Sequence, residues 1–401
     1  MRTFQQSLRR NKTKYILMQL TPRLLLLALL ALTACRTHDF PQYAAKYREY
    51  AYVANTGSNT VTILDVVNLR VDRELAVGPA PVALAAGPIR NEVYVLTSGT
   101  AYINGSVAVI DAAKNSVTAQ IPVGRAPVSI HLDADGSKAY VANTGSNSIS
   151  VIDLKARREV LRFGAGVQPD AAVPSPDGKT LVVANRGANS VALLDPVTGK
   201  VRSVFENCSG AASPVILADS SKVFVPCSAG HQVMVISLAQ TADHKPDQPP
   251  TAQLQAIIDV GRAPVDLALK PDGGELFVSN SLSGTISEVE TNSNDVGGAN
   301  LIGEDPVRGL VSRDNAILYV ADLNSQYVTV YSIDDGKRTG SVHVGDGPSA
   351  LAFSAAGNLI FATDSRSGDV AVIRTATNSL FTLIPAGRNP TAIVDKSFTL
   401  P

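Results

Sequence analysis

A unit of about forty residues that recurs eight times between Tyr52 and the C-terminus predicts an all-β fold. Each copy contains an aromatic–Val strand such as Tyr52-Val53-Ala54-Asn55, and consecutive copies start 42, 46, 42, 42, 53, 42 and 42 residues apart. Repeats of this length with several strands each are typical of β-propellers, in which one repeat forms one blade. The count therefore predicts a single propeller of eight four-stranded antiparallel blades. The copies begin at Tyr52, Tyr94, Tyr140, Val182, Phe224, Phe277, Tyr319 and Phe361.

The strands of each unit follow in a fixed order. An apolar stretch after a Gly-x-x-Pro turn gives the innermost strand, and a turn such as Ser175-Pro176-Asp177-Gly178 leads to the aromatic–Val strand. A polar loop then leads to an alternating strand such as 148–153, and a last strand ends in Val-Gly. Residues 390–394 form an innermost stretch after the eighth unit, whereas Tyr52 has no well-matched one before it. We therefore expect the C-terminal strand to complete the first blade and close the ring.

Composition and charge narrow the class of function. The chain has 401 residues, of which 45% are hydrophobic, which is a globular composition. It contains no Trp, and this excludes repeat architectures that need a Trp in every repeat. Its 35 basic and 35 acidic residues cancel, but residues 1–35 hold six basic and no acidic ones, which leaves the remainder at a net charge of −6. A mildly acidic chain lacks the broad positive field that phosphate binding requires. Nucleic-acid binding is therefore disfavoured.

Residues 1–34 are predicted to be a signal peptide. Basic residues up to Arg23 precede an apolar run at 24–32, which is too short to span a bilayer but suits the centre of a secretory signal. The run ends in Leu32-Thr33-Ala34-Cys35, which resembles a bacterial lipobox whose Cys accepts diacylglycerol. We expect a lipidated tether at 35–48 and the propeller at 49–401. Two or more acyl chains anchor a protein stably, so we expect an exported, membrane-anchored lipoprotein that faces the periplasm or the cell surface.

Three details of this leader leave alternatives open. Met18 is an alternative start, because 18–23 still supplies a basic region. Cys35 could instead be a buried structural Cys after an apolar helix. Arg36 follows Cys35 in place of the Asp that, by resemblance to enterobacterial sorting, favours retention in the inner membrane, and this points to the outer membrane.

The repeats resemble the YVTN-type β-propeller family, which includes YncE-like and surface-layer-type proteins. The resemblance is carried by Tyr52-Val53-Ala54-Asn55, Val77-Gly78-Pro79-Ala80-Pro81 and Ser175-Pro176-Asp177-Gly178, and it covers about residues 50–401. Seven blades are common in the family, so seven is the alternative to the count of eight. The wider superfamily includes lactonases and the propeller domains of nitrous oxide reductase and cytochrome d1-type nitrite reductase. Fold alone therefore assigns no function.

The recurring side chains have structural explanations. Aromatic rings fill one position in seven units, which suits wedges packed between neighbouring sheets. Asn or Asp follows the aromatic–Val strand, where short polar side chains bond their own backbone, and Gly recurs at the turns. The aromatic positions are Tyr52, Tyr94, Tyr140, Phe224, Phe277, Tyr319 and Phe361; the polar ones are Asn55, Asn143, Asn185, Asn280, Asp322 and Asp364; the glycines are Gly78, Gly124, Gly166, Gly261, Gly303, Gly345 and Gly387.

Two cysteines replace recurring residues of the fifth unit. Cys208 falls on the Gly position and Cys227 on the Asn position, so both are expected on adjoining strands at one rim. In an exported protein this favours a disulfide between them, over metal binding or free thiols.

Two insertions interrupt the period. Residues 98–105 are expected on the rim of the Gly-x-x-Pro turns, and residues 238–255 on the opposite rim. Solvated loops are the default interpretation, and a partner-docking loop is the alternative.

The candidate binding residues directly follow the recurring Gly, on the face where loops enter the innermost strands. Arginines at three of these positions could hold an anionic ligand through charge-assisted hydrogen bonds, whereas two acidic residues weaken that field. Solvated rim charges are the alternative. The five residues are Arg125, Arg262, Arg388, Glu304 and Asp346.

The sequence predicts no catalytic residue, no metal and no cofactor. The five His show no metal-ligand spacing, and only His131 and His231 are positioned to be considered as haem ligands. A lactonase would need oxygen ligands for a divalent cation at the channel mouth, and Glu304, Asp346, Asp322 and Asp364 could supply them.

A binding or scaffold module for an envelope protein, peptide or polysaccharide is therefore the leading hypothesis, as a monomeric propeller. A lactonase-like metal-dependent hydrolase or other propeller enzyme is the alternative. Nucleic-acid binding, as in YncE-like relatives, is the third.

Overall fold

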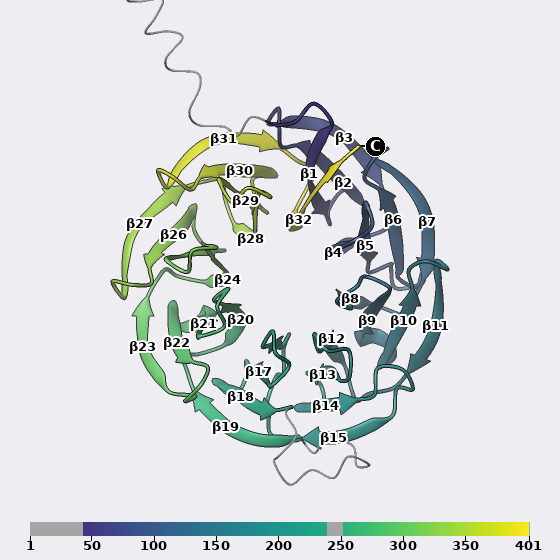
Figure 1. The fold of residues 1–401 in the computed structure, drawn as a ribbon, viewed down its shortest axis with the longest axis vertical. Coiled ribbons are helices and arrows are strands. Elements are labelled where there is room, and N and C mark those ends of the chain that lie inside the picture. Colours follow the sequence, from purple (N-terminus) through teal and green to yellow (C-terminus); the bar gives the residue numbers. More distant parts are fainter. Residues whose placement is uncertain (1–42, 239–251, 401) are drawn as a thin grey trace, which may run out of the picture. The chain divides into compact units, whose positions relative to one another are not determined.

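The computed structural model describes residues 43–238 and 252–400. Eight four-stranded antiparallel sheets form a ring, so the predicted eight-bladed propeller is confirmed (Figure 1). The only helical turns in the described ranges are two 3₁₀ turns, η1 (Thr144–Ser146) and η2 (Ser281–Ser283). Within those ranges no helix is long and apolar enough to cross a membrane. Cys35, the predicted signal and residues 239–251 of the second insertion lie outside the described residues.

Blades 1 to 4 contain the first fifteen strands and the last one. From the innermost strand outward, blade 1 is β32 (Pro390–Thr399), β1 (Tyr47–Asn55), β2 (Thr60–Asp65) and β3 (Arg70–Ala76); blade 2 is β4 (Pro81–Ala86), β5 (Glu92–Thr97), β6 (Ser106–Asp111) and β7 (Ser116–Pro122); blade 3 is β8 (Pro127–Leu132), β9 (Lys138–Asn143), β10 (Ser148–Asp153) and β11 (Arg158–Phe163); blade 4 is β12 (Pro169–Pro174), β13 (Leu181–Asn185), β14 (Ser190–Leu194) and β15 (Val201–Phe205).

Blades 5 to 8 repeat the same order in the second half of the chain. Blade 5 is β16 (Val215–Ile216), β17 (Lys222–Cys227), β18 (Gln232–Ser237) and β19 (Gln253–Asp259); blade 6 is β20 (Pro264–Leu269), β21 (Glu275–Asn280), β22 (Thr285–Glu290) and β23 (Val296–Leu301); blade 7 is β24 (Pro306–Val311), β25 (Ile317–Asp322), β26 (Tyr327–Ser332) and β27 (Lys337–His343); blade 8 is β28 (Pro348–Phe353), β29 (Leu359–Asp364), β30 (Asp369–Arg374) and β31 (Ser379–Pro385).

The C-terminal strand closes the ring as predicted. β32 pairs antiparallel with β1 from Tyr47↔Thr399 to Asn55↔Pro390, so the two ends of the propeller share blade 1 (Figure 1). This pairing gives the first and the last part of the fold a common sheet and leaves no gap in the ring.

The core lies between neighbouring blades. The second and third strands of each blade are covered on both faces, so they read as nearly continuous apolar runs, whereas an outermost strand such as β11 alternates between exposed and half-buried residues. Phe361 of blade 8 packs with Ala51 and Val53 of blade 1, which is the inter-blade wedge expected for the seven aromatic positions. All seven of those side chains are buried.

In blade 3 the recurring Asn joins two neighbouring segments of the blade. Asn143 Oδ1 accepts a hydrogen bond from Gly124 N at 2.9 Å, and its Nδ2 donates to Ser150 Oγ at 2.9 Å. The amide therefore joins the loop that enters the innermost strand to the next strand of the blade. Its Nδ2 also lies 3.5 Å from Val141 O, so the predicted bond to its own backbone is present beside these two contacts. A Cβ at Gly124 would lie 2.5 Å from Asn143 Cγ, so this close approach requires glycine. We call this contact the Gly–Asn clasp.

Candidate functional site

A cavity of about 590 Å³ lies at the centre of the ring, between the innermost strands of the blades. Its lining residues are near the start of those strands, with Arg186 and Ser228 added from loops that follow β13 and β17. The cavity is therefore on the side of the Gly-x-x-Pro turns. Its volume is in the range of small-molecule binding sites.

A β-bulge positions the residues around the cavity. In seven blades the pairing between the innermost strand and its neighbour shifts directly after the first Pro, as between Pro264 and Asp266 and between Pro306 and Arg308. A bulge redirects the side chains beside it. Between one and four of the residues that follow this Pro line the cavity in each of these seven blades.

The lining is divided into two arcs. Blades 3 to 7 form the polar arc, which supplies every charged residue and the imidazole of the cavity together with apolar residues such as Ile130, Val265 and Leu310; its polar members are Ser129, His131, Asp170, Arg186, Ser213, Ser228, Asp266 and Arg308. Blades 8, 1 and 2 form the apolar arc, with Ala350, Leu351, Ala392, Ile393, Val82, Ala83 and Leu84. Thr391 is the polar exception in that arc, and its hydroxyl is hydrogen-bonded to Thr56 Oγ1 at 2.7 Å.

One ion pair of the polar arc joins blades 6 and 7. Arg308 Nη1 donates to Asp266 Oδ1 at 2.6 Å, and Gly309 N donates to Asp266 Oδ2 at 2.8 Å. Both carboxylate oxygens are thus satisfied, and the carboxylate holds the arginine that lines the cavity. Charge-assisted hydrogen bonds of this kind are stronger than those between neutral groups.

A second ion pair lies in blade 4. Arg186, which follows β13, approaches Asp170 of β12 with Nη2 2.8 Å from Oδ1. Burial raises the pKa of Asp170, and the charge of Arg186 opposes that rise. The backbone carbonyl of Asp170 also accepts a hydrogen bond from Ser129 Oγ at 2.8 Å, so blade 3 supports the same part of the wall.

His131 of β8 adds an uncharged imidazole to the polar arc. Burial and, next, the positive charge of Arg308 lower the pKa of His131 to about 4. Blade 7, which carries Arg308, is four blades away from blade 3 around the ring, so this charge acts across the channel. His131 is therefore neutral near pH 7 and offers one donor and one acceptor nitrogen.

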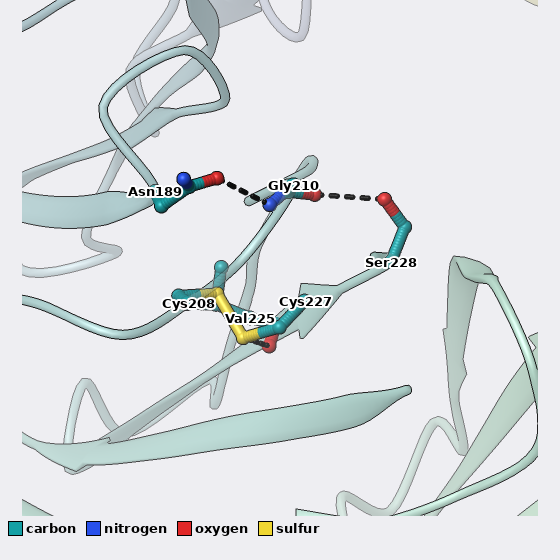
Figure 2. Close-up of a disulfide and its surroundings, with 6 residues drawn as sticks. All are labelled: Asn189, Cys208, Gly210, Val225, Cys227 and Ser228. Atoms are coloured by element: carbon teal, nitrogen blue, oxygen red, sulfur yellow. Dashed lines mark hydrogen bonds between the residues drawn. A yellow bond between two sulfur atoms is a disulfide. The ribbon is translucent and has the colours of Figure 1, made fainter. Parts of the chain in front are cut away.

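The predicted disulfide is present and supports the cavity wall in blade 5 (Figure 2). Cys208 and Cys227 are bonded with their Cα atoms 4.8 Å apart. Next to them, Gly210 N donates to Asn189 Oδ1 at 2.9 Å, and Ser228 Oγ donates to Gly210 O at 2.9 Å. Because β16 has only two residues, the disulfide and these contacts fix the segment that carries Ser213 and Ser228 to the cavity.

The five predicted binding residues lie on the loops around the mouth, outside the cavity lining. Their backbone N–H groups have structural partners: four donate to Ser hydroxyls, and that of Glu304 donates to Asp322 Oδ2 at 2.8 Å. Asp346 also pairs with Arg366 at 3.5 Å. The four Ser contacts are Arg125 with Ser146, Arg262 with Ser283, Asp346 with Ser367 and Arg388 with Ser58. Anion binding by the five side chains stays a prediction.

The carboxylates considered for a cation have partners of their own. Asp322 accepts the N–H groups of Glu304 and Asp305, both at 2.8 Å. Asp364 accepts Gly345 N at 2.9 Å, and burial together with a hydrogen bond to Asp369 raises its pKa to about 8. Over residues 43–238 and 252–400, no group of three or more His, Cys, Asp or Glu side chains could hold a metal ion. His231 Nδ1 accepts the Ala263 N–H at 3.2 Å.

Neither of the two ion pairs in the cavity is predicted by the sequence analysis. The signal was present for one of them: the third residue of the innermost strand is small in most blades, as in Ala83 and Ala350, but Asp266 and Arg308 occupy it in two consecutive blades. Opposite charges at equivalent positions of neighbouring blades predict an ion pair there. Arg186 gave no comparable signal, because it lies in a polar loop.

Comparisons with known proteins support the fold. No protein-family model and no curated protein matches the sequence. Among solved structures, dihydro-heme d1 dehydrogenase NirN in complex with DHE is similar with a TM-score of 0.70 and 16% identity over 90% of this chain and 78% of that one. AztD from Citrobacter koseri is similar with a TM-score of 0.66 and 13% identity, over 88% of this chain and 99% of AztD. A proposed 6-phosphogluconolactonase from Bacteroides uniformis is similar with a TM-score of 0.58 and 16% identity, over 76% of this chain and 98% of that one. At these identities the likeness shows a shared β-propeller fold.

Proposed function

We propose that this protein is a binding module of the bacterial cell envelope, whose protein, peptide or polysaccharide partner contacts the Gly-x-x-Pro face and inserts a group into the central cavity. The cavity carries this proposal, because it joins a concave space of about 590 Å³ to a polar arc with two charged guanidinium groups. Concave sites with a few converging polar groups are the usual ligand sites of proteins. The exposed side chains of Arg125, Arg262 and Arg388, with Glu304 and Asp346, form the outer contacts around the mouth.

The cell envelope is proposed from the leader and the disulfide. The lipobox-like Leu32-Thr33-Ala34-Cys35 supports lipidation at Cys35 after removal of residues 1–34. The Cys208–Cys227 bond supports an oxidising compartment such as the periplasm. Replacement Cys35→Ser is expected to move the protein from the membrane fraction to the soluble fraction. Retention of the variant in the outer membrane would contradict the lipid anchor.

The family proposal rests on the repeats. Eight units with strands such as Tyr52-Val53-Ala54-Asn55 support membership of the YVTN-type propellers, and the closed ring supports a monomeric particle. A mass measurement in solution that gives a multiple of the chain mass would contradict the monomer.

A cavity-filling variant tests the binding proposal. Ala392→Trp introduces an indole at a lining position of the apolar arc, whereas Ala113→Trp introduces the same group on an exposed turn at the opposite rim. Envelope components captured by the wild type and by Ala113→Trp should be lost with Ala392→Trp, provided that its melting temperature is unchanged. Equal capture by all three proteins would overturn the proposal. Triple replacement of Arg125, Arg262 and Arg388 by Ala tests the outer contacts in the same assay.

The same preparation tests the two alternatives. Tightly bound metal together with turnover of lactones would support the lactonase-like hydrolase. Steeply salt-dependent DNA binding would support the third hypothesis.

A further inference from the structure

The two arginines of the cavity are more exposed than the carboxylates that they bind. The side chain of Arg308 is 51% exposed, whereas that of its partner Asp266 is 10% exposed. Arg186 and Asp170 show the same order, at 56% and 21%. All four side chains line the cavity and the charges of both pairs cancel, but the arginines present more of their surface than the carboxylates do.

Both guanidinium groups keep hydrogen-bond donors for a ligand. A guanidinium has five N–H donors, and each ion pair occupies one nitrogen, Nη1 of Arg308 and Nη2 of Arg186. Within the described residues, no further hydrogen bond of these two side chains is present. The paired carboxylate fixes the position of each guanidinium group, so the remaining N–H groups are preorganised. Planar forks of this kind match carboxylate and phosphate oxygens.

The apolar arc, on the other side of the cavity, suits the hydrocarbon part of a ligand. The apolar arc presents Leu84, Leu351 and Ile393 together with small side chains. A ligand that fills the cavity would therefore contact guanidinium groups on one side and hydrocarbon on the other. A purely polar ligand would leave the apolar wall uncovered, and a neutral apolar ligand would desolvate the arginines without compensation.

We propose that the cavity binds an amphipathic anion, with its carboxylate or phosphate on the guanidinium groups of Arg186 and Arg308 and its apolar body against the apolar arc. The inference rests on the proposed function, because it names the ligand chemistry of the same cavity. His131 contributes a neutral nitrogen to the polar side of the ligand. A bound anion in this cavity would favour the protonated imidazole, and the pKa of His131 would then rise from about 4.

Titration calorimetry with four naphthalene probes tests the charge requirement. The full chain, held in nanodiscs with empty nanodiscs as the blank, is titrated with 1-naphthaleneacetate, 1-naphthyl phosphate, 1-naphthaleneacetamide and 1-naphthylmethylamine. At least one anionic probe should bind ten or more times tighter than the amide, and the amine should bind most weakly. The ratio of the two anions shows whether the site prefers carboxylate or phosphate.

Variants of the two arginines test the assignment of the residues. Arg308→Gln and Arg186→Gln should each weaken the anionic probe about tenfold or more, because each removes a charge-assisted contact. The double variant Asp266→Asn/Arg308→Gln keeps a hydrogen-bonded amide pair, so it should fold even where Arg308→Gln leaves Asp266 buried without its partner. The matched control is Arg70→Gln, which removes the arginine of an Arg–Asp pair on the outermost strand β3 and should leave the affinity unchanged.

The outcomes separate this inference from the binding proposal. Equal affinity for the anion and the amide, or unchanged affinity in both arginine variants, would overturn the anion site. If Ala392→Trp then still abolished partner capture, the cavity would remain the binding site for a ligand of other chemistry. Absence of binding by every probe would also overturn the anion site, and partner capture by Ala392→Trp would decide the proposed function on its own.

Discussion

Blades 3 and 5 hold the loop that enters the innermost strand by different contacts. In blade 3 the loop that enters the innermost strand is held by the Gly124–Asn143 clasp, and β8 has six residues. In blade 5 the equivalent positions are Cys208 and Cys227, joined by a disulfide, and β16 has two residues. The covalent bond therefore occurs in the blade whose innermost strand is the shortest of the eight.

The comparison also explains why both residues change together. At the position of Gly124 a Cβ would collide with the Asn143 side chain, so a larger residue is tolerated only if the Asn is replaced as well. Two cysteines meet this condition, because the sulfur–sulfur bond occupies the space of the clasp. Blade 3 is thus a matched control for blade 5, and exchanging the two residue pairs between these blades measures the contribution of the disulfide and of the clasp.

Removal of the disulfide is expected to have the largest effect. The double variant Cys208→Ser/Cys227→Ser should lower the free energy of unfolding by about 3 kcal/mol, because a bridge across about twenty residues restricts the unfolded chain by that amount. Denaturant unfolding with and without a thiol reductant measures the loss. The wild type in reductant should approach the variant, and the variant should not respond to reductant.

A graft of the clasp into blade 5 sharpens this prediction. Cys208→Gly/Cys227→Asn restores the pair of residues found in blade 3, so it should recover part of the stability lost by the Ser variant. No recovery would show that blade 5 cannot form the clasp with its short innermost strand.

Removal of the clasp in blade 3 should cost less. Asn143→Ala eliminates the acceptor of Gly124 N and the donor to Ser150 Oγ in a buried location. We expect a loss of about 2 kcal/mol, since buried groups left without partners carry a desolvation cost. Thermal unfolding measures it. A loss as large as that of the disulfide variant would mean that the two devices are equivalent.

Blade 8 should differ from blade 3 in its dependence on pH. Asp364 and Asp369 stand where blade 3 has Asn143 and Ser148, and burial followed by the hydrogen bond to Asp369 raises the pKa of Asp364 to about 8. The unfolded carboxyl titrates at about 4, so between these values the folded protein binds a proton that the unfolded chain has released. The free energy of unfolding should therefore fall as pH rises from about 4 to about 8.

Asp364→Asn tests this contribution. The variant should reduce the slope of stability against pH by up to one proton, about 1.4 kcal/mol per pH unit, and it should be the more stable protein at pH 8. Unfolding curves between pH 5 and pH 8 measure the slope. The reciprocal change Asn143→Asp in blade 3 should introduce the same kind of slope. Parallel curves for Asp364→Asn and the wild type would contradict the raised pKa of Asp364.

The repeats made the fold predictable, whereas the cavity depends on features that the repeats do not encode. The blade count, the closure by β32 and the Cys208–Cys227 pair all follow from equivalent positions in the sequence. The repeats also predict which residues stand at the mouth, such as Arg125, because these follow the recurring Gly. The lining instead depends on the bulge after each Pro and on contacts between blades, such as Arg308 with Asp266. Both arise only when the sheets pack side by side.

The smallest expected effect concerns Arg125, whose backbone N–H and exposed side chain can be tested separately. Its N–H donates to Ser146 Oγ at 3.2 Å on an exposed loop, so Ser146→Ala should lower the free energy of unfolding by about 0.5–1 kcal/mol. Arg125→Ala keeps that N–H and removes an exposed side chain that forms no hydrogen bond in the described part of the chain, so its stability should be unchanged. Denaturant unfolding of both variants makes the comparison. A loss of stability in Arg125→Ala would assign the arginine to the structure of blade 3, whereas unchanged stability leaves its side chain free to contact a partner.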